Sequence, residues 1–157
     1  MLKNKFFWLV ALVGLLLDQI SKLLIIKNFP QGTFPLLPGI FHLTYTVNTG
    51  AAWSVFQGGV NWLKWLSFLV SLGLMLFAYF GNKLKIIEQI GYGLILSGAM
   101  GNGLDRFIQG YVIDFLDFRL IHFPIFNIAD ICINLGIICL LLATVIEQPD
   151  RRNLHKK

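Results

Sequence analysis

The chain has 157 residues, of which 56% are hydrophobic and only 13% are charged, and its formal net charge at pH 7 is +5. Charged residues make up about a quarter of an ordinary soluble domain, so the composition excludes that class and predicts a membrane protein. The cations flank apolar stretches instead of forming one basic face, which argues against a nucleic-acid partner.

Four apolar stretches have the length that a membrane-spanning helix needs, which is about 20 residues. We predict spans over residues 6–26, 60–80, 86–104 and 128–146, all within a single polytopic membrane domain that covers residues 1–157. The connections after the first and third spans, residues 27–59 and 105–127, are long, whereas the connection after the second span is short.

Basic residues gather on one side of this arrangement. Eight of the 13 Lys and Arg residues lie before the first span, between the second and third spans, or after the fourth: Lys3, Lys5, Lys83, Lys85, Arg151, Arg152, Lys156 and Lys157. Because cytoplasmic segments carry the excess of Lys and Arg, we expect both termini in the cytoplasm and both long loops on the extracytoplasmic side.

The first long loop contains one predicted strand. Residues 40–47 (IFHLTYTV) are rich in aromatic and β-branched side chains, and turn-forming residues bound them on both sides. We therefore expect a small sheet on the outer membrane surface, formed by the loop between the first two spans.

Five of the eight acidic residues are aspartates set in or beside the apolar stretches: Asp18, Asp105, Asp114, Asp117 and Asp130. A charged side chain at the centre of a membrane helix costs about 2.5–3.5 kcal/mol, so such residues indicate function by default. With both termini in the cytoplasm, all five aspartates come to the outer face. Their convergence predicts carboxylate chemistry at a membrane surface.

Two of these aspartates need a cationic partner. Asp18 and Lys22 are four residues apart on one helix face, where they can form an ion pair. Asp105 lies at the end of the third span, where the helix dipole disfavours an anion, and Lys22 or Arg106 could neutralise it. Small residues at positions 98, 99 and 101 would let helices pack closely. A structural role explains this group as well as a catalytic role does.

Asp114 and Asp130 are the candidates for catalysis. Asp114 lies among apolar residues in a segment that we expect to be a loop, whereas Asp117 faces either water or Arg119. Asn127 suits the N-cap of the fourth span and Asp130 its N3 position, so helix capping is an alternative interpretation. The 16-residue separation allows Asp114 and Asp130 to meet, and two close carboxylates cannot both ionise. Such a pair can hydrolyse an amide, with one carboxylate activating water and the other acid polarising the carbonyl.

The two acids of this pair are unequal. The helix N-terminus favours the anionic form of Asp130, whereas the apolar neighbours of Asp114 favour its neutral form. We therefore predict that the resting proton lies mainly on Asp114.

Other chemistries lack the residues that they need. The sequence has no Ser/His/Asp set, no His-Glu-x-x-His motif and no metal-ligand spacing, so we expect neither a metal nor a cofactor. The rival interpretation is a proton-coupled transporter or channel subunit, because intramembrane acids also relay protons. A transporter would place its acids at the midplane and would often show paired repeats, and the halves of this chain look unlike each other.

The motifs, taken together and in order, resemble the lipoprotein signal peptidases, the type II signal peptidases of bacteria. The resemblance rests on five blocks: Asp18-x-x-Ser-Lys22, Asn48-x-Gly-Ala-Ala-Trp-Ser54, Gly98-Ala-x-Gly-Asn-x-x-Asp-Arg106, Val112-x-Asp-Phe-x-Asp117 and Phe126-Asn-x-Ala-Asp130. It implies an all-α membrane protein with four transmembrane helices and a small extracytoplasmic β-cradle between spans one and two.

The resemblance also implies an activity and a set of site residues. Members are aspartyl endopeptidases of the bacterial plasma membrane that cut diacylglyceryl-modified prolipoproteins before the lipidated cysteine. Asp114 and Asp130 match the catalytic pair. The residues that match those lining or bracing the substrate and inhibitor groove are Asn48, Gly98, Asn102, Asp105, Arg106, Asn127 and Ala129, and Asp18 and Lys22 match the motif pair of the first span. The implied partners are prolipoprotein substrates, membrane lipids and globomycin-type inhibitors. We also expect the protein to be a monomer.

Overall fold

The computed structural model describes residues 3–30, 32–50, 59–121 and 123–146. The long helices in these residues are α1 (Lys5–Asn28), α2 (Val60–Phe80), α3 (Ile86–Ile108) and α4 (Ile128–Ile146). Three strands, β1 (Thr33–Leu37), β2 (Phe41–Asn48) and β3 (Val112–Phe118), form a small sheet, and the 3-10 turn η2 (Arg119–Ile121) follows β3. The predicted mostly helical fold with a small sheet is confirmed, and α2 and α4 have the bounds expected from the sequence.

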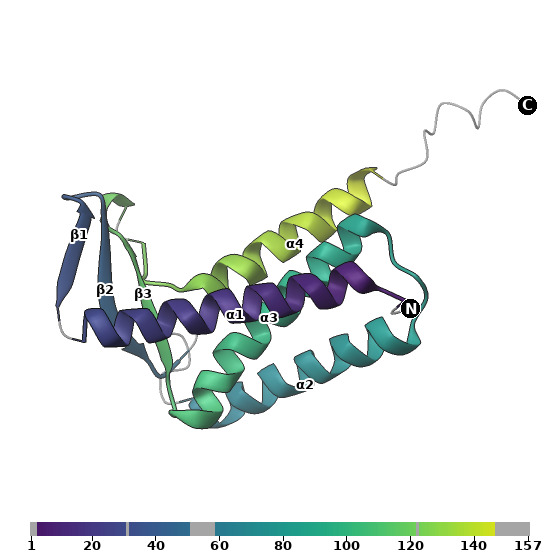
Figure 1. The fold of residues 1–157 in the computed structure, drawn as a ribbon, viewed down its shortest axis with the longest axis horizontal. Coiled ribbons are helices and arrows are strands. Elements are labelled where there is room, and N and C mark those ends of the chain that lie inside the picture. Colours follow the sequence, from purple (N-terminus) through teal and green to yellow (C-terminus); the bar gives the residue numbers. More distant parts are fainter. Residues whose placement is uncertain (1–2, 31, 51–58, 122, 147–157) are drawn as a thin grey trace, which may run out of the picture.

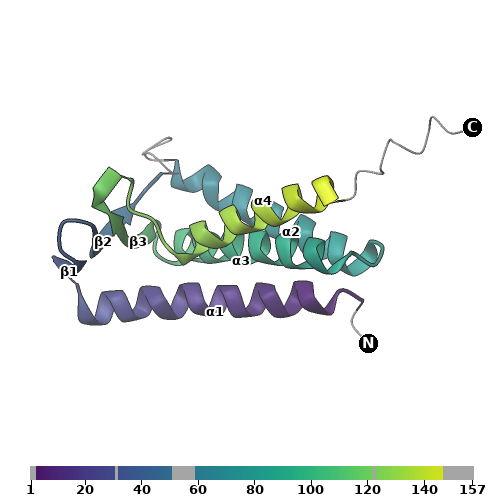
Figure 2. The ribbon, with the colours of Figure 1, turned by 90° about the horizontal axis from the view of Figure 1, so that it is seen from above.

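Helix α3 is the centre of the bundle. It packs against α1, α2 and α4, and α1 lies to one side of the layer that the other helices form (Figures 1 and 2). A glycine on α3 faces each of these neighbours: Gly93 lies against Phe7 of α1, Gly103 against Ser67 of α2, and Gly98 against the Ala129 carbonyl of α4. Close packing was predicted at positions 98, 99 and 101. It is confirmed at Gly98 and at Gly101, which lies against Asp18 of α1 and Ala129 of α4, because the missing side chains let the helices approach.

Three helices in the described residues, α1, α2 and α4, are long and apolar enough to cross a membrane by length and composition. The fourth, α3, is of similar length at 23 residues, but it contains many glycines and carries Asp105 and Arg106 near its end. Because the other three helices surround α3, its polar residues face protein groups instead of lipid. This packing explains how a less apolar helix takes its place in a membrane bundle.

The sheet corrects two expectations about the loops. Its antiparallel order is β1-β2-β3, so its third strand comes from the connection between α3 and α4, not from the loop between α1 and α2 alone. Asp114 lies in this strand, opposite Thr46 of β2, and not in a loop. The strand forms because Val112, Ile113 and Phe115 are buried β-branched or aromatic residues. Asp114 and Asp117 interrupt the apolar pattern of this segment, so the sequence pattern does not predict the strand.

One further boundary differs from the prediction. Helix α3 continues to Ile108, four residues beyond the expected end at Leu104. Asp105 and Arg106 are therefore helical residues in the last turn, instead of the first residues of a loop.

At the end of the bundle far from the sheet, Asn4 joins the start of α1 to the end of α2 and to the α2–α3 connection. The start of α1 and the end of α4 both lie at the end of the bundle opposite the sheet (Figure 1). The buried Asn4 side chain donates to the Ala78 carbonyl at 2.8 Å and accepts from the Leu84 N–H at 3.0 Å. These bonds place Lys3 and the α2–α3 connection at the same end of the molecule.

Replacement of Gly98 by alanine is expected to destabilise the bundle. An added Cβ would overlap the Ala129 carbonyl oxygen and lie 2.6 Å from Ile133 Cγ1, so α3 and α4 would have to move apart. Overpacking of this kind costs about 1–3 kcal/mol. The matched control is Gly73→Ala on α2, where a Cβ has no neighbour within 4 Å. Thermal unfolding in detergent micelles should show a lower Tm for Gly98→Ala and an unchanged or higher Tm for Gly73→Ala; equal Tm values would contradict the packing argument.

Candidate active site

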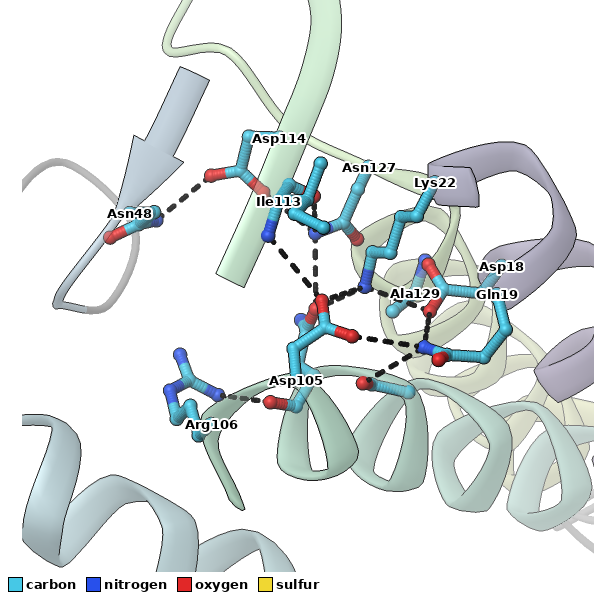
Figure 3. A network of polar contacts seen from close by, with 12 residues as sticks. Asp18, Gln19, Lys22, Asn48, Asp105, Arg106, Ile113, Asp114, Asn127 and Ala129 are labelled. Carbon is cyan, nitrogen blue, oxygen red and sulfur yellow. Dashed lines mark hydrogen bonds and ion pairs between the residues drawn. The ribbon is translucent and has the colours of Figure 1, made fainter. Parts of the chain in front are cut away.

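A buried cation lies between two carboxylates at the end of the bundle that carries the sheet. The Lys22 Nζ atom is 2.8 Å from Asp18 Oδ2 and 2.8 Å from Asp105 Oδ2, and all three side chains are at most 2% exposed (Figure 3). The predicted Asp18–Lys22 pair is confirmed. Of the two partners proposed for Asp105, Lys22 is the one that pairs with it.

Asp18 also connects α1 to the start of α4. Its Oδ1 atom accepts a hydrogen bond of 2.9 Å from the Ala129 backbone N–H. The carboxylate reaches this position only because Gly101 has no side chain, since a Cβ at Gly101 would collide with Asp18 Oδ2. Asp18 therefore joins helices α1, α3 and α4 at one point.

Gln19 was not among the residues predicted for the site. Its Nε2 atom donates to Asp18 Oδ2 and Asp105 Oδ1, each at 3.1 Å, and lies 3.3 Å from the Gly101 carbonyl oxygen. The signal for it in the sequence was a polar amide next to Asp18 within an apolar span. Gln19 supplies further donors to the carboxylates that Lys22 neutralises.

Asn127 and Asp130 cap the start of α4 reciprocally. The Asp130 N–H donates to Asn127 Oδ1 at 3.0 Å, and the Asn127 N–H donates to Asp130 Oδ2 at 3.1 Å. The predicted capping is thus confirmed. It fixes the Asp130 carboxylate at the N-terminal end of the helix, where the helix dipole stabilises an anion.

Asp114 enters the same region from β3. Its side chain is 3% exposed, and its two oxygens accept hydrogen bonds of 2.6 Å from Asn127 Nδ2 and 2.9 Å from Asn48 Nδ2. Figure 3 shows Asn48 reaching Asp114 from the end of β2. Asp114 is therefore held by amides from two separate elements.

Two side-chain amides connect Asp114 to Asp130. Asn127 Nδ2, which donates to Asp114, also lies 3.0 Å from Asn102 Oδ1, and Asn102 Nδ2 donates to Asp130 Oδ1 at 2.9 Å. The two carboxylates also interact electrostatically. Strand β3 and the beginning of α4 thus bring both predicted acids into one polar cluster, as their 16-residue separation allowed.

Arg106 lies beside this cluster without pairing with Asp105. Its guanidinium donates to the Gly50 carbonyl at 2.9 Å and to the Asn102 carbonyl at 3.3 Å. No ion pair joins Arg106 to Asp105, and its buried Nε atom has no hydrogen-bond partner, within the part of the chain that the structure describes. The remainder of the predicted Asn48 block, residues 51–54, lies outside the described residues.

Asp117 is separate from the cluster. Its Oδ2 atom accepts from Thr44 Oγ1 at 2.7 Å and from Arg119 Nε at 2.8 Å, so the predicted alternative that it faces Arg119 is confirmed. Partial burial raises its pKa, but the hydrogen bonds from Thr44 and Arg119 and the positive charge of Arg119 outweigh that effect, so the pKa of Asp117 is lowered. Asp117 is therefore a buried carboxylate of the sheet that Thr44 and the half-exposed Arg119 keep ionised.

The comparison with known families decides the class of this protein. A sequence model of the signal peptidase (SPase) II family matches residues 10–146. The chain belongs to the signal peptidase II family. This match covers every residue that the motifs singled out, from Asp18 to Asp130.

Relatives and solved structures agree with the membership. A lipoprotein signal peptidase from Microcystis aeruginosa is 64% identical over 90% of this chain and 93% of its own length, and one from Synechocystis is 57% identical over 96% and 94%. A bacterial membrane enzyme solved by the in meso method at 2.3 Å resolution has a TM-score of 0.83 and 28% identity, covering 92% of this chain and 90% of that one. A second such enzyme, solved at 1.9 Å, has a TM-score of 0.78 and 29% identity, covering 89% and 92%.

The environment of Asp114 in this signal peptidase II family member raises the pKa of its carboxyl group. Burial raises its pKa most, and the neighbouring charge of Asp130 raises it further. Hydrogen bonds from Asn48 and Asn127 and the charge of Lys22 act in the opposite direction, and the resulting pKa is about 7. Asp114 therefore holds its proton through the acidic range and loses it near neutrality, in line with the predicted proton on this residue.

The titration of Asp114 can be observed without substrate. Because its pKa is raised from 3.8 to about 7, an infrared band of a protonated carboxyl should persist below neutrality and disappear as the pH rises through 7. Asp114→Asn should abolish this band. Asn48→Ala removes a donor to the carboxylate and should move the disappearance to higher pH. If the band instead survives in Asp114→Asn and is lost in Asp130→Asn, the proton lies on the other acid.

Proposed function

We propose that this protein is a membrane aspartic endopeptidase that removes the signal peptide of diacylglyceryl-modified prolipoproteins, cutting before the lipidated cysteine. Family membership supports a protease that processes prolipoproteins. The observation that carries the aspartic mechanism is the pair of buried acids, Asp114 and Asp130, that amide groups connect at the sheet end of the bundle.

The two acids have different roles in this proposal. Asp130 is the general base, since a helix N-terminus and donors from Asn102 and Asn127 stabilise its anion. Asp114 is the general acid, since it keeps its proton up to a pH of about 7. The pair titrates as a unit, so its measured pKa values belong to both carboxyl groups.

Hydrolysis then proceeds with balanced proton transfers. Asp130 takes a proton from a water molecule whose oxygen attacks the scissile carbonyl carbon, while Asp114 gives its proton to the carbonyl oxygen. The resulting tetrahedral diol collapses when the proton on Asp130 passes to the leaving nitrogen and the diol returns a proton to Asp114. The carbon–nitrogen bond breaks, and both carboxyl groups recover their starting state.

The position of the cluster suits a lipid-modified substrate. We place the sheet end at the extracytoplasmic face of the bacterial plasma membrane and both chain termini in the cytoplasm. Support comes from Lys3 and Lys83, which belong to the opposite end of the bundle, because basic residues favour the cytoplasmic side. The acyl chains of the substrate can then remain in the bilayer while the peptide reaches the two acids.

The rival function, a proton-coupled transporter or channel subunit, is less well supported. Transport sites lie near the bilayer midplane, between repeated halves. Here the carboxylates gather at the end of α3 and the beginning of α4, beside a sheet that has no counterpart in the other described residues. Family membership also favours the protease.

The partners follow from this function. We expect prolipoproteins as substrates, membrane lipids around α1, α2 and α4, and inhibition by cyclic depsipeptides of the globomycin type. Asn48, Asn102, Arg106 and Asn127 are the residues that we expect to contact or brace the bound peptide. We expect the proposed chemistry to need only the two carboxyl groups and water, and we expect the enzyme to act as a monomer.

Replacement of either acid tests the proposed function. Asp114→Asn and Asp130→Asn keep the shape of the side chain but cannot exchange the proton. Each should lower kcat by about 10²–10⁴-fold, the contribution that a general acid or base typically makes. The assay is the cleavage of a diacylated lipobox peptide by the detergent-purified or lipid-reconstituted enzyme, with and without globomycin.

The matched control is Asp117→Asn in the same strand. Asp117 accepts from Thr44 and Arg119 and takes no part in the cluster of Asp114 and Asp130, and an asparagine oxygen can still accept both hydrogen bonds, so this variant should keep near-normal turnover. Near-normal turnover by Asp114→Asn or Asp130→Asn would contradict the aspartic mechanism.

A further inference from the structure

The Lys22 ammonium group makes one contact that its ion pairs do not explain. A lysine has three N–H donors. Two of them serve Asp18 and Asp105, and the third is directed at Asn102 Oδ1, at a distance of 3.2 Å. Asn102 is the residue whose amide nitrogen donates to Asp130. Lys22 is therefore connected to Asp130 through a single side chain.

The direction of the Asn102 amide is fixed by its neighbours. Its oxygen faces two donors, Lys22 Nζ and Asn127 Nδ2, and its nitrogen faces the Asp130 carboxylate. A rotation of this amide by 180° would set a nitrogen against both donors and an oxygen against the carboxylate. All three contacts would become repulsive, so only the observed orientation is compatible with Lys22.

Lys22 fixes this orientation more firmly than Asn127 does. The Asn127 amide nitrogen has two hydrogens and lies near three acceptors: Asp114 Oδ1 at 2.6 Å, Asn102 Oδ1 at 3.0 Å and the Ile113 carbonyl at 3.2 Å. Its donation to Asn102 is therefore shared. Each hydrogen of Lys22, in contrast, has its own acceptor, because the ammonium group has three hydrogens and three partners.

We propose that Lys22 is a positioning residue for the catalytic pair. It holds the Asn102 amide with its nitrogen toward Asp130, so that the Asp130 carboxylate accepts a hydrogen bond from the amide and does not face the amide oxygen. The proposal rests on the proposed aspartic mechanism and adds a role for a residue of α1 that touches neither acid of the pair. In this proposal the ion cluster of Lys22, Asp18 and Asp105 stabilises, through the Asn102 amide, the ionised form of Asp130, which is the form that can accept a proton from water.

Several charged groups face Asp130 and must be separated from the amide effect. They are Asp18 and Lys22 on α1, Arg106 on α3 and Asp114 on β3, with the Cys132 thiol on α4 itself. Removal of Lys22 changes the local charge as well as the amide contact. A charge effect on Asp130 would persist when Asn102 is absent, whereas an effect that passes through the amide would not.

A double-mutant cycle between Lys22 and Asn102 makes this distinction. The variants are Lys22→Met, Asn102→Ala and both together, and Lys27→Met is the control because Lys27 is an exposed lysine on the same helix. The readouts are kcat, KM and the pH profile of kcat/KM for a diacylated lipobox peptide, with thermal unfolding measured in the same micelles. A second form of the lysine variant, Lys22→Met/Asp105→Asn, keeps the net charge of the Asp18, Lys22 and Asp105 cluster unchanged.

The proposal predicts a defined pattern. Lys22→Met and Asn102→Ala should each lower kcat about tenfold or more, and each should move the acid limb of the profile upward by about one pH unit. Lys22→Met should keep KM within about twofold. The combined variant should be no worse than the more impaired single variant. Lys22→Met/Asp105→Asn should show the same displaced acid limb, and Lys27→Met should match the wild type.

Other results would overturn the proposal. Losses that multiply in the combined variant, a wild-type acid limb in Lys22→Met/Asp105→Asn, or loss of the fold in that charge-balanced variant would each make Lys22 a structural residue only. None of these results would restore activity to Asp114→Asn or Asp130→Asn. Failure of the positioning role is thus distinct from failure of the proposed function.

Discussion

The ion cluster of Lys22, Asp18 and Asp105 is the interaction on which the rest of the site depends. A buried charge costs several kcal/mol unless it is paired, so these three groups must remain together in the folded protein. Lys22 and Asp18 come from α1 and Asp105 from α3, and Asp18 also binds the Ala129 N–H of α4. The position at which α4 begins, and with it Asp130, is therefore set by a contact that α1 provides.

The close approach of helices around this cluster explains two of the glycines of α3, Gly98 and Gly101. A side chain at Gly101 would displace Asp18, and one at Gly98 would displace the Ala129 backbone. Gly101 lies where α3 meets Asp18 of α1, and Gly98 lies where α3 meets the start of α4. Glycine lowers the intrinsic stability of a helix by roughly 0.5–1 kcal/mol, and here the close approach of three helices around the buried charges offsets that cost. Gly98 and Gly101 thus let α3 approach the residues that position the site.

Much of this arrangement could be predicted from the sequence, for reasons that specific residues illustrate. The spans were visible because apolar length is a strong signal, and the Asp18–Lys22 pair because helical periodicity is regular. Strand β3 was missed because Asp114 and Asp117 interrupt its apolar pattern, although its neighbours are buried. Gln19 and the two amides between the acids depend on contacts between distant segments, which no local pattern records.

The coupling free energy between Lys22 and Asp105 is the most direct test of the account. Unfolding of the wild type, Lys22→Met, Asp105→Asn and the double variant in the same micelles gives this quantity. We predict that Lys22→Met alone lowers the free energy of unfolding by about 3–5 kcal/mol, because two carboxylates lose their buried partner. The double variant should recover about 1–3 kcal/mol relative to additivity. Strictly additive losses would contradict the claim that this buried pair holds α1 against α3.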